Sequence, residues 1–356
     1  MAERLKILIV RNDKLGDFIL TYPSFALLKA SLPNAVVHAL VRDYTRPMAE
    51  IYPWIDAVII DPESGRGISG WYSLVHRLRQ ERYDVVITLF STTRIATALL
   101  AAGIPYRLAP ATKVAQIFYN HRLEQRRSRS EKPEYAYNLD LICQMLADHE
   151  AIPAPMQTHE VEGDWLVPTI SRPLLAFSDD QAQLKREFCA TMNLKISDRL
   201  VFIHPGSGGS ATNLRADQYS RLANLLGEDQ ELAFVISAGP GELPVAKQVA
   251  AGINAPAVIY ESEGGLVEFA RILQLADLFV SGSTGPLHIA GALDRPTAAF
   301  YPGHRSATPL RWQTLNSPSR RLAFTPPPGD AEREVANIDI EAAAHVILEH
   351  FFPPAH

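Results

Sequence analysis

The sequence predicts an α/β protein made of two doubly wound, Rossmann-like domains. Its length of 356 residues suggests two domains. Short apolar runs alternate with helical patterns along most of the chain, which is typical of parallel sheets covered by helices. A proline-rich stretch at residues 150–173 interrupts this alternation and predicts the connection between the domains. We therefore expect domains at residues 1–165 and 174–335, followed by a terminal helical segment at 336–356.

The first domain is predicted to begin directly with a strand. Residues 5–10 are apolar at nearly every position, as expected for a strand that is covered on both faces of its sheet. A helical pattern starts near Phe18 and stops at Pro33. Further strands are predicted at 36–41, 57–60 and 85–89, with helices around 45–51 and 71–80.

The second domain repeats the alternation of strands and helices. A last helix is predicted at 340–351, where Ile340, Ala343, Ala344, Ile347 and Phe351 recur at helical spacing, and this spacing favours packing in a core. The apolar runs predict strands at 200–204, 232–237, 257–260, 278–281 and 297–301, and helices near 216–226, up to 251, at 266–275 and at 287–293.

The composition is that of a soluble globular protein. The chain has a formal net charge of −5, which argues against a dedicated nucleic-acid-binding protein. It contains no run of about 18 apolar residues, the length needed to span a membrane, and its start lacks the pattern of a secretory signal. The two cysteines, Cys143 and Cys189, have neither metal-ligand spacing nor a disulfide framework, which suits the reducing cytoplasm. We predict no metal site.

The loop after the first predicted strand, residues 11–17, is the first candidate for chemistry. Gly16 lets the backbone approach a ligand closely. Asp17 lies at the start of the following helix, where a carboxylate either caps the helix or takes part in catalysis. The loop lacks the pattern G-x-G-x-x-G, so the fingerprint of a dinucleotide site is absent.

Two loops of the second domain are candidates for nucleotide binding. The glycine-rich loop 204–210 either offers backbone N–H groups to a phosphate or is a plain flexible turn. It does not match the Walker pattern of phosphate-binding loops. In the loop 239–242, Glu242 either caps the next helix or binds a ribose diol, as acidic residues do in nucleotide-binding folds.

A third loop of the second domain, residues 281–288, also joins a strand to a helix. Ser283 and Thr284 can cap this helix or bind phosphate oxygens, and His288 is either structural or catalytic. Three such loops in one domain favour a nucleotide there and a different substrate facing Asp17.

Residues 121–132 form a basic segment, with five arginine or lysine residues and two acidic residues. This segment is either a solvated loop or a local site for an anionic acceptor, which a chain of negative net charge can still carry. The guanidinium fork of arginine suits phosphate and carboxylate groups.

Segments spread from about residue 5 to 315 resemble, in order, glycosyltransferase family 9, the lipopolysaccharide heptosyltransferases. Residues 11–33 resemble the family's opening, with a basic residue, a Gly-Asp pair and a helix with an internal proline. Residues 204–213 resemble its second-domain phosphate loop, and residues 283–302 resemble its (Asp/Ser)-Thr-Gly-x-x-His segment. Parts of 120–142 resemble its middle segment.

The resemblance implies a GT-B fold, in which two Rossmann-like domains face a central cleft. The first domain would bind the acceptor and the second the nucleotide sugar, and the terminal helix of such proteins often packs back on the first domain. The implied reaction is an inverting, metal-independent transfer without a cofactor, of a sugar such as heptose from ADP-heptose onto a lipopolysaccharide core or a related anionic glycan. A lipid-linked acceptor would make peripheral contact with the inner membrane an option for a cytoplasmic protein of this kind.

The resemblance also implies roles for single residues. Asp17, in the Gly-Asp pair, is the expected catalytic base. Acceptor binding is assigned to Arg11, Lys14, Arg122 and Arg126. Donor binding is assigned to Ser207, Gly208, Gly209, Thr212, Asn213, Glu242, Ser283, Thr284, Gly285 and His288.

The expected mechanism requires a base for the attacking hydroxyl and hydrogen-bond donors for the leaving diphosphate. A carboxylate at a helix N-terminus should have an ordinary or lowered pKa, so Asp17 would be a weak base that accepts its proton late. The backbone N–H groups of residues 207–209 and 284–285 would stabilise the leaving diphosphate.

The chain departs from the family pattern at two positions on the donor side. Ser283 stands where many heptosyltransferases have aspartate, and residues 211–214 lack the lysine common near the phosphate loop, so that Arg215 is the nearest cation. These departures leave the donor sugar open. Two alternatives to transfer are a nucleotide-sugar epimerase of GT-B fold and a non-catalytic nucleotide-sugar-binding protein.

Overall fold

The computed structural model describes residues 4–62, 67–112, 114–151, 158–166, 170–209, 212–228, 230–329 and 334–353. Within it the chain forms two compact units, which divide between Ser171 and Arg172. Each unit is built around one sheet and is described by itself.

The first unit contains a six-stranded, fully parallel sheet with the order β3-β2-β1-β4-β5-β6. Its central strand β1 is buried on both faces because every residue from Ile7 to Val10 is apolar. The strands are β1 (Lys6–Val10), β2 (Val36–Val41), β3 (Ala57–Ile60), β4 (Val85–Thr88), β5 (Tyr106–Pro110) and β6 (His121–Leu123).

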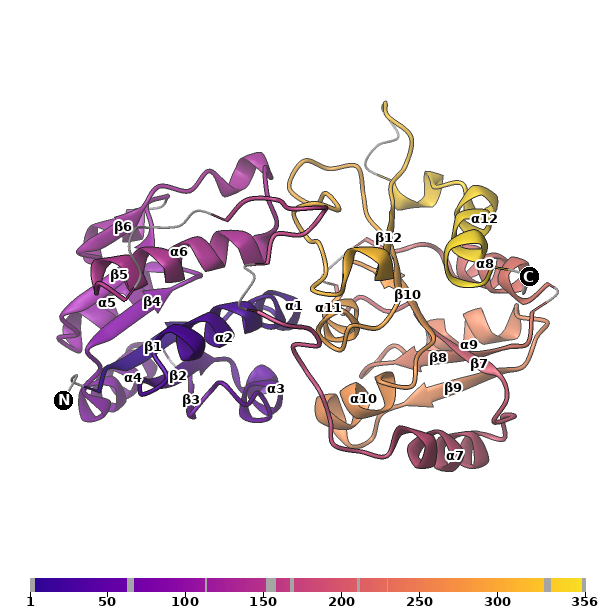
Figure 1. Ribbon diagram of the computed structural model, residues 1–356, viewed down its shortest axis with the longest axis horizontal. Helices are drawn as coiled ribbons and strands as arrows, with labels where there is room; N and C mark the ends of the chain where they lie inside the picture. The colour runs from indigo at the N-terminus through magenta and orange to yellow at the C-terminus, as the bar shows by residue number, and fades with distance from the viewer. Residues whose placement is uncertain are drawn as a thin grey trace. The chain divides into compact units, whose positions relative to one another are not determined.

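Helices cover both faces of the first sheet. Helices α2 and α6 pack together on one face (Figure 1). Helices α4 and α5 pack together over the core formed by the alternate residues of the strands. The helices are α1 (Leu15–Ile19), α2 (Tyr22–Ser31), α3 (Arg46–Glu50), α4 (Gly67–Glu81), α5 (Thr93–Ala101) and α6 (Glu134–Asp148), with short 3₁₀ turns at Asp43–Thr45, Val114–Phe118 and Arg127–Arg129.

The second unit contains another six-stranded parallel sheet, with the order β12-β11-β10-β7-β8-β9. Strand β8 is buried along its whole length. The strands are β7 (Arg199–His204), β8 (Leu232–Ala238), β9 (Ala257–Glu261), β10 (Leu278–Gly282), β11 (Thr297–Phe300) and β12 (Arg321–Phe324).

The terminal helix belongs to the second unit. Ala343, Ala344 and Ile347 of this helix, α12, are buried in the core of that unit, and α12 packs on α8. The expected packing of this helix on the first domain stays a prediction. The helices of the unit are α7 (Gln181–Met192), α8 (Ala216–Gly227), α9 (Leu243–Ala251), α10 (Gly265–Leu273), α11 (Gly285–Ala292) and α12 (Ile340–Phe351), with 3₁₀ turns at Pro318–Arg320 and Val335–Asn337.

The structure confirms every strand predicted from the sequence and adds elements that the pattern did not reveal. The strands β5, β6 and β12 were missed because each is short, with three to five residues, and contains an arginine that interrupts the apolar run. The helical pattern of the first unit is split into α1 and α2 by a break at Leu20 and Thr21. In the expected connection, the described residues hold one isolated bridge, between Val161 and Asp164, and residues 152–157 and 167–169 lie outside the described residues.

Each sheet has one point where the strand order reverses. In the first sheet this point lies between β1 and β4, and in the second it lies between β7 and β10. Ligands of doubly wound sheets bind outside the carboxyl ends of the strands at this switch point. The loop 11–14 and the loop 205–215 follow β1 and β7, so both candidate loops start where a ligand is expected.

Candidate functional site

In the first unit, the loop after β1 ends in helix α1. The N–H of Arg11 still bonds the carbonyl of Leu40, 3.0 Å away, so the pairing of β1 with β2 continues into the loop. Lys14 is the N-cap residue of α1, with extended backbone and no side-chain cap bond. Asp17 is the third residue of the helix, and its side chain makes no cap, so its interpretation as a helix cap was wrong.

The side chain of Arg11 lies at the centre of a cluster of three carboxylates. Its Nε donates to Asp13 at 2.8 Å, its Nη1 to Glu134 at 2.8 Å, and its Nη2 to Asp17. Only 3% of Arg11 is exposed. A buried guanidinium with every nitrogen bonded is fixed in place, and it holds the carboxyl of Asp17 in one orientation.

The first residue of α6, Glu134, connects this cluster to the basic segment. Its Oε1 accepts from Arg11 and also from Nη1 of Arg127, at 2.6 Å. Arg127 in turn bonds Gln125 through Nε and Nη2. The sequence did not single out Glu134, and the only signal for it was the resemblance of the middle segment to the family.

The environment of Asp17 favours its protonated form. Burial raises the pKa of Asp17 to about 7. The charge of Arg11 lowers this pKa, whereas the carboxylates of Asp13 and Glu134 raise it further. The expectation of an ordinary or lowered pKa was therefore wrong, because it considered only the helix N-terminus and not the burial. The side chain is still 13% exposed. A carboxyl of this kind can exchange a proton near neutral pH.

The structure separates the four expected acceptor-binding residues. Arg11 is used internally, as described above. Lys14 is exposed, and in the part of the chain that the structure describes its ammonium has no ionic partner. Arg126 is exposed and lies 3.5 Å from Glu124.

Arg122 lies at the far end of α6 from the cluster. It lines a pocket of about 410 Å³ together with Gln144 and Asp148, at the end of α6. Glu134, at the beginning of this 15-residue helix, contacts Arg11, whereas Gln144 and Asp148 lie toward its other end. The assignment of Arg122 to acceptor binding stays a prediction.

A second polar group lines the same edge of the first sheet. Asp61, after β3, accepts from the amide of Asn12 at 2.6 Å and from Nη1 of Arg94 at 2.8 Å. The Nε of Arg42 donates to the carbonyl of Asn12 at 2.9 Å. These contacts fix the loop 11–14 from the side opposite to Glu134, and none of the residues involved was identified from the sequence.

In the second unit, the three candidate loops lie side by side. They follow β10, β7 and β8, which are neighbours in the sheet. Gly208 and Gly209 adopt φ values of +52° and +71°, which favour glycine. The convergence of these loops, expected from the sequence, is therefore a feature of the fold.

The carboxylate of Glu242 joins two of these loops. Its two oxygens accept from the N–H groups of Gly208 and Gly239, at 2.8 and 2.9 Å, and it lies 3.4 Å from Nε2 of His204. A Cβ on Gly206 would lie 2.0 Å from the Glu242 carboxyl carbon, so this approach requires glycine there. Glu242 makes no side-chain cap to α9, which excludes the capping interpretation in this structure. The Gly208 N–H expected to face a phosphate is therefore bonded to Glu242 here.

Asn213 connects the phosphate-type loop to the end of β10. Its amide donates to the carbonyls of Pro205 and Gly206, both at 2.8 Å. A Cβ on Gly282 would lie 1.7 Å from Asn213 Oδ1, so only glycine allows this contact. Within the described residues this buried oxygen has no hydrogen-bond partner. Gly282 was not identified from the sequence. Of the other expected donor residues in this loop, Ser207 is half-buried and Thr212 is exposed.

The start of α11 holds the remaining expected donor-binding residues. Thr284 is the N-cap residue but makes no side-chain cap, and its N–H bonds the carbonyl of Gly282 at 2.8 Å. Ser283 and Gly285 are half-buried beside it. His288 is buried, and burial lowers the pKa of His288 to about 4, so its ring is neutral at physiological pH. Its Nδ1 has no hydrogen-bond partner within the described residues.

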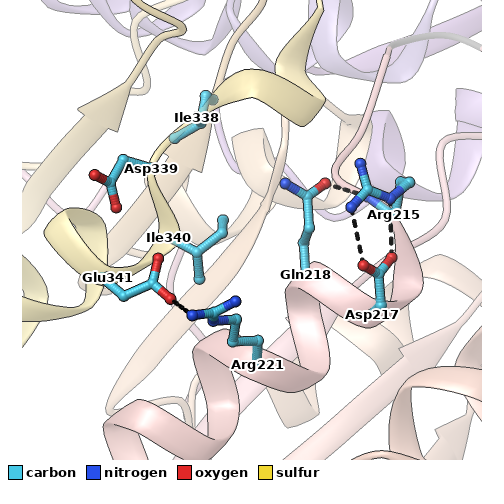
Figure 2. A pocket seen from close by; sticks show the side chains of 8 residues that line it. All are labelled: Arg215, Asp217, Gln218, Arg221, Ile338, Asp339, Ile340 and Glu341. Carbon is cyan, nitrogen blue, oxygen red and sulfur yellow. Dashed lines mark hydrogen bonds and ion pairs between the residues drawn. The ribbon is translucent and has the colours of Figure 1, made fainter.

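A separate pocket of about 260 Å³ lies between the beginnings of α8 and α12 (Figure 2). Arg215, the cation nearest to the glycine-rich loop in sequence, forms two bonds with Asp217 at 3.0 and 2.9 Å. Figure 2 also shows Arg221 paired with Glu341 across the pocket. Both cations are paired with carboxylates of the protein.

Neither a metal cluster nor a membrane-spanning helix is found in the described ranges. No group of three or more His, Cys, Asp or Glu side chains in them could hold a metal ion. None of their helices is long and apolar enough to cross a membrane.

Comparison with known proteins places this architecture in one family. Residues 71–323 match the model of glycosyltransferase family 9 (heptosyltransferase). A Haemophilus influenzae protein named "Putative glycosyltransferase" is 42% identical over 350 residues, covering 96% of each chain.

Solved structures of the family have the same fold. A glycosyl transferase of family 9 from Veillonella parvula matches with a TM-score of 0.78 at 16% identity, over 99% of each chain. The E. coli ADP-heptose lipopolysaccharide heptosyltransferase II matches with a TM-score of 0.73 at 18% identity, over 98% of each chain. The two parallel sheets therefore have the GT-B fold, as the resemblance implied, and the chain belongs to glycosyltransferase family 9, the heptosyltransferase family.

Proposed function

We propose that this protein is an inverting, metal-independent glycosyltransferase that moves heptose from ADP-heptose onto an anionic glycan of the lipopolysaccharide core. The enzyme class follows from the family. The donor and acceptor are proposed by analogy with relatives, one of which is named for ADP-heptose and lipopolysaccharide. Such an acceptor is lipid-linked, so we also propose that the enzyme acts in the cytoplasm at the inner face of the membrane.

The observation that carries this proposal is the state of Asp17. Its carboxyl lies in the first turn of α1 at the switch point of the first sheet, is held by the buried Arg11, and has a pKa of about 7. A purely structural ion pair would be expected to lower the pKa of its carboxyl. A carboxyl poised near neutral pH is suited to accept a proton from a sugar hydroxyl.

In the proposed reaction, an acceptor hydroxyl attacks the anomeric carbon of the donor as the bond to the diphosphate breaks. The transition state resembles an oxocarbenium ion, as in glycoside hydrolysis. Asp17 takes the proton of the attacking hydroxyl. A positioned base of this kind contributes about 10²–10⁴-fold to the rate. Arg11 bonds Asp17 and Glu134 bonds Arg11, so both residues position Asp17.

The second unit is proposed to bind the nucleotide diphosphate. The first turn of α11 provides backbone N–H groups at a helix N-terminus, which favour anions. The neutral ring of His288 can offer one hydrogen bond without adding charge. The Gly208 N–H would be available to a phosphate only if Glu242 gave up its bond to it, so we propose that the donor competes with Glu242 for this group.

Exposed cations in the first unit are proposed to attract the acceptor. Lys14 is the N-cap residue of α1, three residues before Asp17, and Arg126 immediately precedes Arg127, which bonds Glu134. Neither side chain is buried in a structural ion pair, so both can meet phosphate or carboxylate groups of a glycan.

Two experiments test the proposal. Purified protein is incubated with ADP-heptose and a lipopolysaccharide core that lacks heptose, and the product is examined by mass spectrometry for one added heptose. A thermal-shift screen with ADP-, GDP- and UDP-sugars at equal concentration identifies the donor class by its stabilisation. Stabilisation by UDP- or GDP-sugars alone, or transfer of another sugar, would contradict the assigned donor. If the protein isomerises the donor when no acceptor is present, the proposed reaction would be epimerisation and not transfer.

A further inference from the structure

Three side chains form a second network on the side of the loop 11–14 that lies opposite Glu134. The amide of Asn12 donates to Asp61 at 2.6 Å, and Nη1 of Arg94 donates to the same carboxylate at 2.8 and 3.1 Å. Nη2 of Arg94 donates to the carbonyl of Pro62. We refer to Asn12, Asp61 and Arg94 as the Asn12 network. The reaction described above assigns none of these residues a role.

Two polar atoms of the Asn12 network have no partner among the residues that the structure describes. Oδ1 of Asn12 and Nε of Arg94 are both buried and make no hydrogen bond. Asn12 as a whole is only 6% exposed. Buried polar atoms are nearly always hydrogen-bonded, because otherwise nothing compensates for their lost hydration. One acceptor and one donor of this kind in a single network point to a ligand group that bonds both.

The network itself fixes the direction of these two atoms. A carboxylate only accepts hydrogen bonds, so Asp61 faces Nδ2 of Asn12 and leaves Oδ1 directed elsewhere. In the planar guanidinium of Arg94, Nη1 and Nη2 are bonded and Nε is not. Oδ2 of Asp61 accepts from both side chains, so Asn12 and Arg94 lie next to each other. The network therefore presents an oriented acceptor beside an oriented donor.

The Asn12 network lies at the switch point of the first sheet. Asn12 follows β1, and Arg94 is the second residue of α5, which follows β4. From β1 the chain continues through α1 into α2, which packs with α6 on one face of the sheet, whereas α5 packs with α4 over the other face. Asp17 and Arg94 therefore stand at the starts of two helices on opposite sides of the position where a ligand is expected.

A hydroxyl group fits the two unpartnered atoms better than an anion does. A hydroxyl donates one hydrogen bond and accepts another, which matches Oδ1 of Asn12 and Nε of Arg94. The positive charge of Arg94 is balanced by Asp61, and the two Nη atoms that would hold a phosphate or carboxylate are already bonded. An anion beside Oδ1 of Asn12 would meet a second acceptor and no donor from that side chain.

We propose that Asn12 and Arg94 bind a hydroxyl of the acceptor glycan and thereby select the acceptor. This hydroxyl is not the one that reacts, because Asp17 is held by Arg11 on the side of Glu134. The inference rests on the proposed function and deepens it. A site that bonds a substrate hydroxyl discriminates strongly, since an acceptor that lacks this hydroxyl leaves the buried groups unpaired. A trapped water molecule is the other occupant of such a position, and the test separates the two.

The test uses two variants that each remove one of the unpartnered atoms. Arg94→Lys keeps a positive charge beside Asp61 but lacks Nε, and Asn12→Ala lacks Oδ1. Transfer is measured with ADP-heptose and a delipidated core oligosaccharide without heptose. In each variant, kcat/KM for the oligosaccharide should fall about tenfold or more, mainly through KM. Calorimetric affinity for the donor should be unchanged.

The matched controls remove side chains of the same types that have internal partners. In Arg79→Lys the lost guanidinium bonds the carbonyl of Ala101, and in Asn120→Ala the lost amide bonds the carbonyl of Pro105. Both controls should keep the kcat/KM of the unchanged protein for the oligosaccharide.

A purely structural role of the Asn12 network gives a different result. If the two atoms bind a trapped water, Asn12→Ala and Arg94→Lys should lower Tm and leave kcat/KM for the oligosaccharide as it is in the controls. That outcome would overturn the inference.

Binding of the oligosaccharide is also measured by calorimetry without a donor, which separates this inference from the proposed function. Weaker binding by the two variants than by the two controls supports the inference whichever sugar is transferred. The absence of heptose transfer by all five proteins would contradict the proposed function alone. Equal affinity of all five proteins for the oligosaccharide, or no binding by the unchanged protein, would overturn the inference.

Discussion

The sheet edges at the carboxyl ends of the strands differ in their charged side chains between the two units. In the first unit, four charged side chains, Arg11, Asp13, Asp17 and Glu134, gather in a buried cluster after β1. In the second unit, the corresponding edge is formed by glycine loops, backbone N–H groups and the neutral His288, with Glu242 bonded to two of those N–H groups. The same topology therefore carries a cluster of ionisable side chains in one unit and a set of largely neutral backbone donors in the other.

This difference shows what each type of chemistry requires from a fold. Proton transfer needs a group whose pKa can be moved by burial and by neighbouring charges, which only side chains provide. Binding of a diphosphate needs donors in fixed positions, which backbone N–H groups at loop and helix starts provide. We therefore expect substitutions in the first unit to change rates and pH profiles, and substitutions in the second to change donor affinity.

The largest effect is expected for Asp17→Asn. The amide keeps the shape of the side chain but cannot accept the proton, so kcat should fall about 10²–10⁴-fold while donor affinity is unchanged. The matched control is Asp43→Asn, in the 3₁₀ turn after β2, which should leave kcat unchanged.

The same substitution makes a prediction about stability. Because burial raises the pKa of Asp17 to about 7, the folded state favours the protonated form, and its stability falls as pH rises through 7. Asp17→Asn should therefore raise Tm above pH 7. Full activity of the variant, or an unchanged Tm at alkaline pH, would contradict the assigned state of this carboxyl.

The next largest effect is expected for Gly282→Ala in the second unit. The added Cβ would lie 1.7 Å from Asn213 Oδ1, so the side chain of Asn213 must move and give up its bonds to Pro205 and Gly206. Affinity for the nucleotide sugar should fall by about tenfold or more, since the positioned donors are displaced. The control Gly227→Ala, whose Cβ would be 3.4 Å from its nearest neighbours, should bind normally in the same calorimetric titration. A fall in kcat with unchanged affinity would contradict the division of roles between the two units.

A smaller effect is expected for Glu134→Gln, seen in the pH profile. With the unchanged enzyme, kcat/KM should fall about tenfold per pH unit below pH 7, as Asp17 becomes protonated. Glu134 raises the pKa of Asp17, so removal of its charge should move the acid side of the kcat/KM profile toward lower pH. Relative to its plateau value, kcat/KM at pH 6 should then increase about threefold or more. Glu124→Gln, at an exposed acid of the same segment, should leave the profile unchanged. A shift in the other direction would show that Glu134 does not act on Asp17 through its charge.

Much of the fold could be predicted because buried strands of parallel sheets have a strong local signature. Strand β1 is apolar over most of its length, and helix α12 has apolar residues at helical spacing over Ile340–Phe351, where the structure places it. Helix α7 was missed because half of its sequence, QAQLKREFCATM, is polar and only Leu184, Phe188 and Cys189 are buried. The partner of α12 was not predictable either, because an apolar face does not identify the surface that it covers.

The candidate site was predictable only in part, for a related reason. The loops after β1, β7, β8 and β10 were found because each follows a recognisable strand. The pair Arg11–Glu134 joins residues 123 positions apart, and no local pattern relates them. The raised pKa of Asp17 arises from burial and from these distant neighbours, so it could only follow from the three-dimensional structure.

The smallest effect is expected for the pH dependence of donor binding. Burial lowers the pKa of His288 to about 4, so between about pH 5.5 and 8 its ring stays neutral and should add no charge to the donor site. Calorimetric affinity for an intact nucleotide sugar should therefore change by less than about twofold over this range. Nucleotide diphosphates are unsuitable probes, because their terminal phosphate titrates there. A rise in affinity as pH falls below about 6.5, absent in His288→Gln, would mean that the ring binds the diphosphate as a cation, and the second unit would then use side-chain charge as the first one does.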